Sequence, residues 1–320
     1  MLDSLARMRG FMTTNTDCAH SAVPVPSARA ALAAGVGTLL LWSGTPIANK
    51  IAVDYMDGLT AGLLRSTLAG IVAVLVAVAL RLPFPRDGKD RLLLILSGVA
   101  SFAAWPVTLS IGLEHTSAGH AALILATIPV IAVLLAALLD RRAPSALWWL
   151  GAGIALGGCA LLVGAARPDE AGSAGAWTPL GDGIVFLGGA ICAVGYVAGG
   201  RLSPRIGTAA TTFWGLSVAM IVLVPLFASA APRTRWSAVA VDGWLAMGWM
   251  SLLSSLAAYA LWFYALGRGG IGRTSSLLLV MPAITLLGAA LVLGETIGWL
   301  MVASCALVVF GTYLAHRYAR

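Results

Sequence analysis

Arg65 is the clearest candidate for a chemical role in the sequence, because it is the only charged side chain in the apolar segment at residues 59–80. A charge at the centre of a bilayer costs about 2.5–3.5 kcal/mol on insertion scales, so it needs a partner or a water-filled space. One interpretation is that its planar guanidinium binds a carboxylate or phosphate of a solute. The other is that it extends outward to Asp54, Asp57 or backbone carbonyls and has a structural role.

Polar and aromatic side chains recur at helical spacing in several other apolar segments, which gives each segment one polar face. Trp42, Thr45 and Asn49 share such a face, and Trp105 and Thr108 share another. Apolar walls with a few placed polar groups are typical of sites that orient small molecules. The predicted substrate-binding residues are Trp42, Thr45, Asn49, Arg65, Trp105, Thr108, His120, Tyr196, Ser255, Tyr259, Trp262 and Ser275.

Each of these residues also has a structural interpretation. A Ser or Thr often bonds a carbonyl of its own helix, and a Trp or Tyr near a helix end often anchors at the membrane surface. His120 is the one titratable group available for proton coupling, although a hydrogen-bonding role at a helix end is favoured for it. Anchoring is the expected role of Trp148, Trp149, Trp236, Trp244 and Trp299.

Patterns of catalytic and cofactor sites are missing from the sequence. Its cysteines, Cys18, Cys159, Cys192 and Cys305, have neither CxxC nor Cys/His spacing, so no metal site and no disulfide is expected. The glycine-rich string at 151–158 lies in an apolar segment, which is the wrong context for a dinucleotide loop. The predicted spans have no interior Asp or Glu, which disfavours cationic substrates and proton coupling through a buried carboxylate. We therefore expect no cofactor and no enzymatic activity.

Composition identifies a polytopic membrane protein. Of the 320 residues, 59% are hydrophobic and 10% are charged, against roughly 25% charged in a soluble domain. The net charge of +7 comes from basic residues that are scattered singly or in pairs, which excludes a nucleic-acid-binding surface. The expected partners are a lipid bilayer and a small-molecule substrate.

Ten segments are long and apolar enough for a transmembrane helix of about 20 residues. They lie at residues 30–49, 59–80, 92–113, 121–139, 146–166, 183–200, 208–231, 243–267, 274–293 and 297–315. The predicted fold class is therefore an all-α membrane protein. If the N-terminus is inside, fifteen basic residues lie on the cytoplasmic side and four lie outside, which places both termini in the cytoplasm.

The chain also repeats itself. Residues 112–139 align with residues 265–292, and the alignment pairs Pro129 with Pro282. Five spans per half is an odd number, so the second half is expected to cross the membrane in the opposite sense. Such an inverted repeat is typical of secondary transporters, in which two halves rock around one central site.

Four parts are expected along the chain: a cytoplasmic tail at 1–28, a first repeat at 29–166, an external linker at 167–182 and a second repeat at 183–320. Eighteen of the 20 basic residues are Arg, which suggests a GC-rich bacterial genome and hence the bacterial inner membrane.

Three stretches resemble the EamA-type repeats of the drug/metabolite transporter superfamily. They are LLWSGTPIANKIAVDYMDGLTAGLLRSTLAG, HTSAGHAALILATIPVIAVLLAALL and LGRGGIGRTSSLLLVMPAITLLGAALVLGETIGWL. The resemblance covers roughly residues 30–315. It implies ten helices in a five-plus-five inverted repeat, and export of metabolites, among them amino acids.

Other function classes stay open at this point. A carrier of anionic solutes, such as sugar phosphates or nucleotide sugars, would use Arg65 and Arg273. An intramembrane enzyme would need clustered carboxylates or a nucleophile with a base, and the sequence offers neither. A non-transporting scaffold is disfavoured by the polar faces of the spans.

Two pairs of glycines have the spacing that permits close approach of membrane helices. They are Gly153 with Gly157 and Gly195 with Gly199. We interpret both pairs as packing within the chain, with a homodimer interface as the alternative. The protein is therefore expected to be a monomer or a homodimer.

Overall fold

The computed structural model describes residues 28–141, 143–164, 177–269 and 276–318. These residues form helices and their connections, without strands. Nearly all of the expected tail, most of the expected linker and the predicted site residue Ser275 lie outside them.

The first half of the chain contains the following elements in order. They are α2 (Ala28–Ser43), α3 (Thr45–Val53), α4 (Gly58–Ala79), α5 (Gly88–Ser97), the π-helical η1 (Gly98–Ala104), α6 (Trp105–Leu113), α7 (Ala118–Leu125), α8 (Ile128–Asp140) and α9 (Ala146–Gly164).

The second half follows a similar order. Its elements are α10 (Pro179–Ile206), α11 (Thr208–Ala230), the short η3 (Ala231–Arg233) and η4 (Trp236–Ala238), α12 (Val241–Gly248), the π-helical η5 (Trp249–Ala257), α13 (Ala258–Gly269), η6 (Ser276–Val280), α15 (Met281–Leu293) and α16 (Trp299–Arg317).

Prolines mark most of the points where one helical segment gives way to the next. Pro46, Pro106, Pro129 and Pro282 lie in the first turns of α3, α6, α8 and α15. Proline lacks an amide hydrogen and its ring clashes with the carbonyl one turn earlier, so it fits the start of a helical segment better than the interior. Pro225, in contrast, lies inside the continuous helix α11.

Within the described residues, eight helical units are long and apolar enough to cross a membrane. Two shorter apolar helices lie at Ala146–Leu161 and Leu277–Leu293, where the sequence predicted full spans. Each adjoins a segment that the structure does not describe. Helix α10 begins at Pro179 rather than at the predicted residue 183, so Asp182 belongs to a helix and not to a linker.

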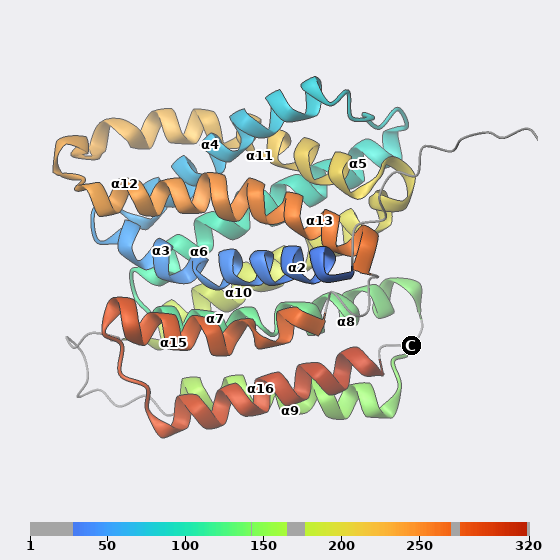
Figure 1. Ribbon diagram of the computed structural model, residues 1–320, viewed down its shortest axis with the longest axis vertical. Helices are drawn as coiled ribbons and strands as arrows, with labels where there is room; N and C mark the ends of the chain where they lie inside the picture. Colours follow the sequence, from blue (N-terminus) through green and yellow to red (C-terminus); the bar gives the residue numbers. More distant parts are fainter. Residues whose placement is uncertain (1–27, 142, 165–176, 270–275, 319–320) are drawn as a thin grey trace, which may run out of the picture.

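Helices of the two halves pack against each other in a regular pattern (Figure 1). Helix α4 packs along α11 and α9 packs along α16, and each of these contacts joins elements of the same rank in the two halves. Helix α2 packs along α13, and α6 packs along α10. Exchange of the halves leaves this set of contacts unchanged, because it converts the α2–α13 contact into the α10–α6 contact.

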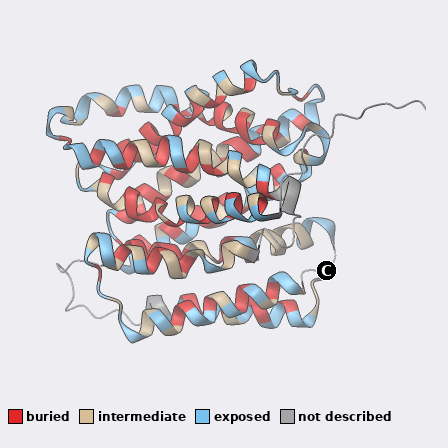
Figure 2. Cartoon of the chain, in the orientation of Figure 1, coloured by how far each residue is buried: buried red, intermediate tan, exposed pale blue. Residues whose placement is uncertain are grey.

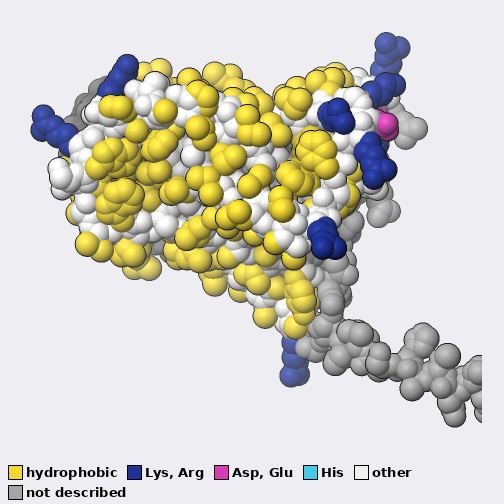
Figure 3. All heavy atoms as spheres, turned by 90° about the horizontal axis from the view of Figure 1, so that it is seen from above, with side chains coloured by type: hydrophobic (Ala, Val, Ile, Leu, Met, Phe, Trp, Pro, Cys, Tyr) yellow, Lys and Arg dark blue, Asp and Glu magenta, His cyan; other side chains and the backbone are white. Residues whose placement is uncertain are grey.

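An apolar belt forms the lateral surface of the bundle. Leu75, Leu187 and Leu291 are 62%, 60% and 86% exposed. On the face that Figure 3 shows, hydrophobic side chains fill the space between two ends that carry Lys and Arg. Buried residues concentrate where helices face one another (Figure 2). An exposed apolar surface of this extent matches hydrocarbon rather than water, so this is a multi-pass membrane protein.

The two glycine pairs differ in their surroundings. A Cβ atom at Gly195 would lie 2.1 Å from Ser101 Oγ, and one at Gly199 would lie 2.8 Å from Ser97 Oγ. Packing of α10 against the unit formed by α5 and η1 therefore needs glycine there, as predicted. At Gly153 and Gly157, nothing within the described residues lies within 4 Å of an added Cβ, so the prediction that this pair packs inside the chain is wrong.

Candidate functional site

A cavity of about 410 Å³ lies between the two halves of the bundle. Its wall draws on α2, α3, α4, η1, α6, α8, α10, η5, α13, α15 and α16, so both halves contribute. The lining extends to Trp148 in the first turn of α9 and to His316 in the last turn of α16. Cavities that hold a single small molecule have about this volume.

Arg65, the eighth residue of α4, lines this cavity. The side chain is buried, and its Nε and Nη1 atoms have no hydrogen-bond partner among the described residues. Asp57 instead caps α4, because it accepts hydrogen bonds from the Thr60 amide at 2.9 Å and the Thr60 hydroxyl at 2.7 Å. The ion pairs of the described residues do not include Arg65. The interpretation that Arg65 extends outward to Asp54 or Asp57 is therefore wrong.

Aromatic rings form one wall of the cavity and its backing. The rings of Trp42 and Tyr259 meet edge to face, with their centroids 5.1 Å apart. The ring of Phe102 meets that of Tyr259 in the same way, with a centroid distance of 5.9 Å. Trp42 Nε1 donates to the Ser254 carbonyl at 3.0 Å, and the hydroxyls of Thr45 and Ser254 are 2.6 Å apart. These two bonds hold α2 and α3 against η5 and fix the orientation of the Trp42 ring.

Seven of the twelve predicted site residues line the cavity, which does not by itself show that they bind a solute. They are Trp42, Thr45, Arg65, Trp105, Tyr196, Ser255 and Tyr259.

Four predicted residues lie elsewhere and Ser275 is outside the described residues. Thr108 donates to carbonyls of its own helix at Ala104 and Trp105. Trp262 packs behind the cavity wall, with its ring centroid 5.5 Å from that of Trp42. Asn49 is fully buried with its side-chain amide unpartnered among the described residues, and His120 belongs to a separate polar cluster.

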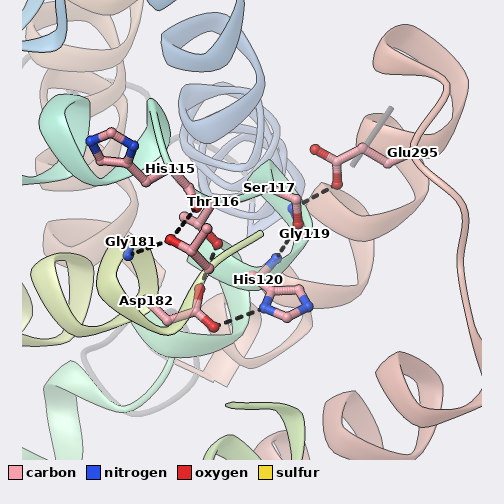
Figure 4. Close-up of polar contacts among 9 residues, drawn as sticks. His115, Thr116, Ser117, Gly119, His120, Gly181, Asp182 and Glu295 are labelled. Carbon is pink, nitrogen blue, oxygen red and sulfur yellow. Dashed lines mark hydrogen bonds and ion pairs between the residues drawn. The ribbon is translucent and has the colours of Figure 1, made fainter. Parts of the chain in front are cut away.

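That polar cluster lies at one end of the bundle. It consists of Thr116, His120, Asp182 and Glu295, and we call it the end cluster (Figure 4). His120 Nδ1 lies 2.9 Å from Asp182 Oδ2, and the Thr116 hydroxyl donates to the other oxygen of Asp182. His120 is 4% exposed and Asp182 is 1% exposed. Because each oxygen of the buried carboxylate has a donor, this charge is well accommodated.

Glu295 completes the end cluster from the connection between α15 and α16 (Figure 4). Its carboxylate accepts hydrogen bonds from the amides of Ala118 at 2.7 Å and Gly119 at 3.0 Å, the first two residues of α7. An acid at this position satisfies otherwise unpaired amides and interacts favourably with the helix dipole.

Lys50 joins α3 to the same end of the bundle. Its ammonium donates to the carbonyls of Leu113 at 2.7 Å and Thr116 at 3.0 Å, where α6 ends. The segment that enters α10 is also tied there, because Thr178 donates to the His115 carbonyl through its amide and its hydroxyl. Together with the end cluster, these contacts connect α3, α6, α7, α10 and the α15–α16 connection.

The structure adds buried groups that the sequence analysis missed. Asp182 and Glu295 are buried carboxylates, so the expectation that the spans exclude acids is wrong for the fourth residue of α10. Thr178 caps α10 and Pro179 follows it, and these start signals could have placed Asp182 inside the helix.

Trp148 is 1% exposed and lines the cavity, so its expected role as a surface anchor is wrong.

Comparison with known proteins agrees with this architecture. The profile of the EamA-like transporter family matches residues 29–164 and 179–317. The uncharacterised transporter YdeK of Bacillus subtilis is 28% identical over 282 residues, which cover 88% of this chain and 95% of that protein.

A second relative carries a more specific name. The probable terminal-alkyne amino-acid exporter of Streptantibioticus cattleyicolor is 26% identical over 287 residues, covering 88% of this chain and 91% of that protein. A solved structure titled only as the crystal structure of a protein shares the fold with a TM-score of 0.58 and 20% identity. That match covers 90% of this chain and 97% of the solved one.

Proposed function

The chain belongs to the EamA-like transporter family, and from this membership we propose that it is an alternating-access carrier that exports small metabolites, with amino acids the first class to test. The cavity that both halves line is the observation that carries the proposal. Midplane sites at the interface of two repeats are the usual place for substrate in secondary transporters. The relative named as a probable amino-acid exporter supports the choice of amino acids.

The proposed fold has ten spans in a five-plus-five inverted repeat. The set of helix contacts that survives exchange of the halves supports two equivalent repeats. The π-helical segments support it as well, because η1 and η5 occupy the same place in each half and contribute Ser101 and Ser254 to the cavity.

In the proposed cycle, the end cluster closes one side of the membrane in this conformation. The cavity lining reaches in the other direction, to the last turn of α16 near the C-terminus (Figure 1). The excess of basic residues in the C-terminal and related connections supports a cytoplasmic location for that side. The conformation is then inward-facing, and export requires the contacts of the end cluster to separate.

Efflux from proteoliposomes tests the transport proposal. Vesicles are loaded with a mixture of the standard amino acids, and mass spectrometry identifies those that leave. We expect protein-dependent loss of apolar or aromatic amino acids. Ala126→Trp fills the cavity and should stop this loss, whereas Ala160→Trp adds the same volume on the exposed face of α9 and should not. Equal efflux from protein-free vesicles would contradict amino-acid export.

Cysteine labelling tests the orientation. Ser237 and Lys89 are exposed at positions assigned to opposite sides of the membrane. In intact cells, an impermeant thiol reagent should label Ser237→Cys and leave Lys89→Cys unlabelled. The reverse pattern would invert the topology and turn the inward-facing assignment into an outward-facing one.

A further inference from the structure

The cavity contains donor groups that no described residue satisfies. Arg65 Nε and Nη1 and the Ser66 hydroxyl are all buried without hydrogen-bond partners among the described residues, and both residues line the cavity. A buried guanidinium is costly when nothing neutralises it. These adjacent residues of the cavity lining therefore leave one positive charge and several donor groups without a partner among the described residues.

Acidic side chains are absent from the part of the cavity lining that the structure describes. Three carboxylates at the closed end of the bundle have other partners: Asp57 caps α4, Asp182 pairs with His120, and Glu295 accepts from the start of α7. The counter-charge for Arg65 is thus not supplied by any of these three carboxylates.

The form of the unpaired group indicates the charge of the ligand. A guanidinium is a planar fork that matches the two oxygens of a carboxylate. Arg65 and His316 are the basic residues among the described lining, and His316 lies at the far end of the cavity in the last turn of α16. One fork with a neighbouring hydroxyl fits a singly charged carboxylate better than a phosphate, which carries more charge.

The remaining wall indicates the rest of the ligand. Trp42, Trp105, Phe102 and Tyr259 give the cavity broad aromatic faces, and the lining lacks a described acid to pair with an ammonium group. We propose that Arg65, assisted by Ser66, binds the carboxylate of the transported solute. The substrate class is monocarboxylates with an apolar or aromatic group, for which an α-amino group is not required. This inference rests on the proposed transport function and specifies its substrate.

Four matched probes separate the carboxylate from the amino group. They are L-phenylalanine with both groups, 3-phenylpropionate with the carboxylate alone, L-phenylalaninamide with the amine alone and 3-phenylpropionamide with neither. Thermal unfolding of the purified full chain is followed as each probe is titrated, because a ligand that binds the folded state raises the Tm. The first two probes should raise the Tm of the wild type, and the two amides should not.

Variants then test whether Arg65 causes the preference for carboxylates over amides. Arg65→Gln should lose about ten- to hundredfold in affinity for the two carboxylates, which is the usual value of a hydrogen bond to a charged group. Arg65→Lys should recover part of it, because the charge remains but the fork is lost. Ser66→Ala should have a smaller effect. Arg201→Gln is the matched control, since Arg201 pairs with Asp140 and does not line the cavity.

The outcomes distinguish a failure of the carboxylate assignment from a failure of the proposed transport function. Equal binding of all four probes would keep the cavity as a solute site but overturn the carboxylate assignment. A Tm rise with glucose 6-phosphate alone would overturn it in favour of phosphorylated solutes. If none of the probes raises the Tm, the carboxylate assignment fails whatever the efflux assay shows. The comparison in wild type decides the ligand class even if the Arg65 variants do not fold.

Discussion

The end cluster and the central cavity differ in whether their buried charges have hydrogen-bond partners among the described residues. In the end cluster, both oxygens of Asp182 have donors and Glu295 accepts two backbone amides. In the cavity, Arg65 keeps two nitrogens without a partner among the described residues. Burial alone therefore does not show whether a charge has a partner within the protein. The hydrogen bonds of Asp182 and Glu295 show it for the end cluster.

This difference has opposite consequences for stability. Removal of one member of a partnered buried set leaves the others unpaired, which is strongly destabilising. Removal of an unpartnered buried charge takes away a group that already lacks compensation, so it should leave the stability unchanged or raise it. The two regions are therefore expected to respond with opposite sign to the loss of a charge.

The largest effect is expected for Asp182→Ala. Loss of the carboxylate leaves His120 and the Thr116 hydroxyl without their partner inside the bundle, and broken buried pairs cost about 3–5 kcal/mol. The measurement is the free energy of unfolding in detergent. Asp242→Ala is the control, because Asp242 is exposed and accepts a hydrogen bond from Tyr55 at the surface. Equal stability of the two variants would contradict a structural role for the end cluster.

A smaller effect is expected for Glu295→Gln. The amide retains one acceptor oxygen but loses the negative charge, so one of the two α7 amides is left unsatisfied at a cost of about 1–3 kcal/mol. Because Glu295 closes the end of the bundle in the proposed cycle, hydrogen exchange at the start of α7 should also accelerate. Unchanged exchange would show that the Glu295 contacts do not hold this end closed.

Two glycines at the start of α10 sharpen the comparison. A Cβ atom at Gly181 would lie 2.6 Å from the backbone carbon and oxygen of His115, whereas one at Gly183 would have no described residue within 4 Å. Gly181→Ala should therefore displace the end cluster and cost about 1–3 kcal/mol. Gly183→Ala should be neutral or slightly stabilising, since alanine favours the helix. Thermal unfolding distinguishes them, and indistinguishable Tm values would refute the predicted close approach.

The smallest effect in binding free energy is expected at the cavity wall. Trp42→Ala and Trp105→Ala remove aromatic faces from the cavity, so solute selectivity should change. Large substrates should lose about 1–3 kcal/mol of binding free energy relative to small ones. Competition between aromatic and small apolar solutes measures this. An unchanged selectivity order would assign both residues to packing alone.

Much of the helical framework could be predicted because it depends on local signals. Continuous apolar segments placed the helices within a few residues, and prolines marked the segment starts at Pro129 and Pro282. The predicted polar faces located the cavity in part, because Trp42, Thr45 and Trp105 line it whereas Asn49 and Thr108 from the same faces do not.

The end cluster could not be predicted in the same way. Glu295 finds its partners 177 and 176 residues away at the start of α7, and no local pattern encodes that distance. Trp148 was assigned to the membrane surface because it lies at a helix end, but its neighbour Trp149 takes the exposed face while Trp148 faces inward. The rotation of a helix about its axis depends on its neighbours, and one sequence does not specify them.

The unfolding free energy of Arg65→Met, measured without and with 3-phenylpropionate, tests the central claim most directly. Met has similar length and no charge, so the variant removes the unpaired guanidinium while it keeps most of the packing. We predict that the ligand-free variant is at least as stable as the wild type, by up to about 2.5–3.5 kcal/mol, and that the ligand no longer stabilises it. A ligand-free variant that is clearly less stable than the wild type would show that Arg65 has a structural partner. That result would contradict the assignment of its charge to the solute.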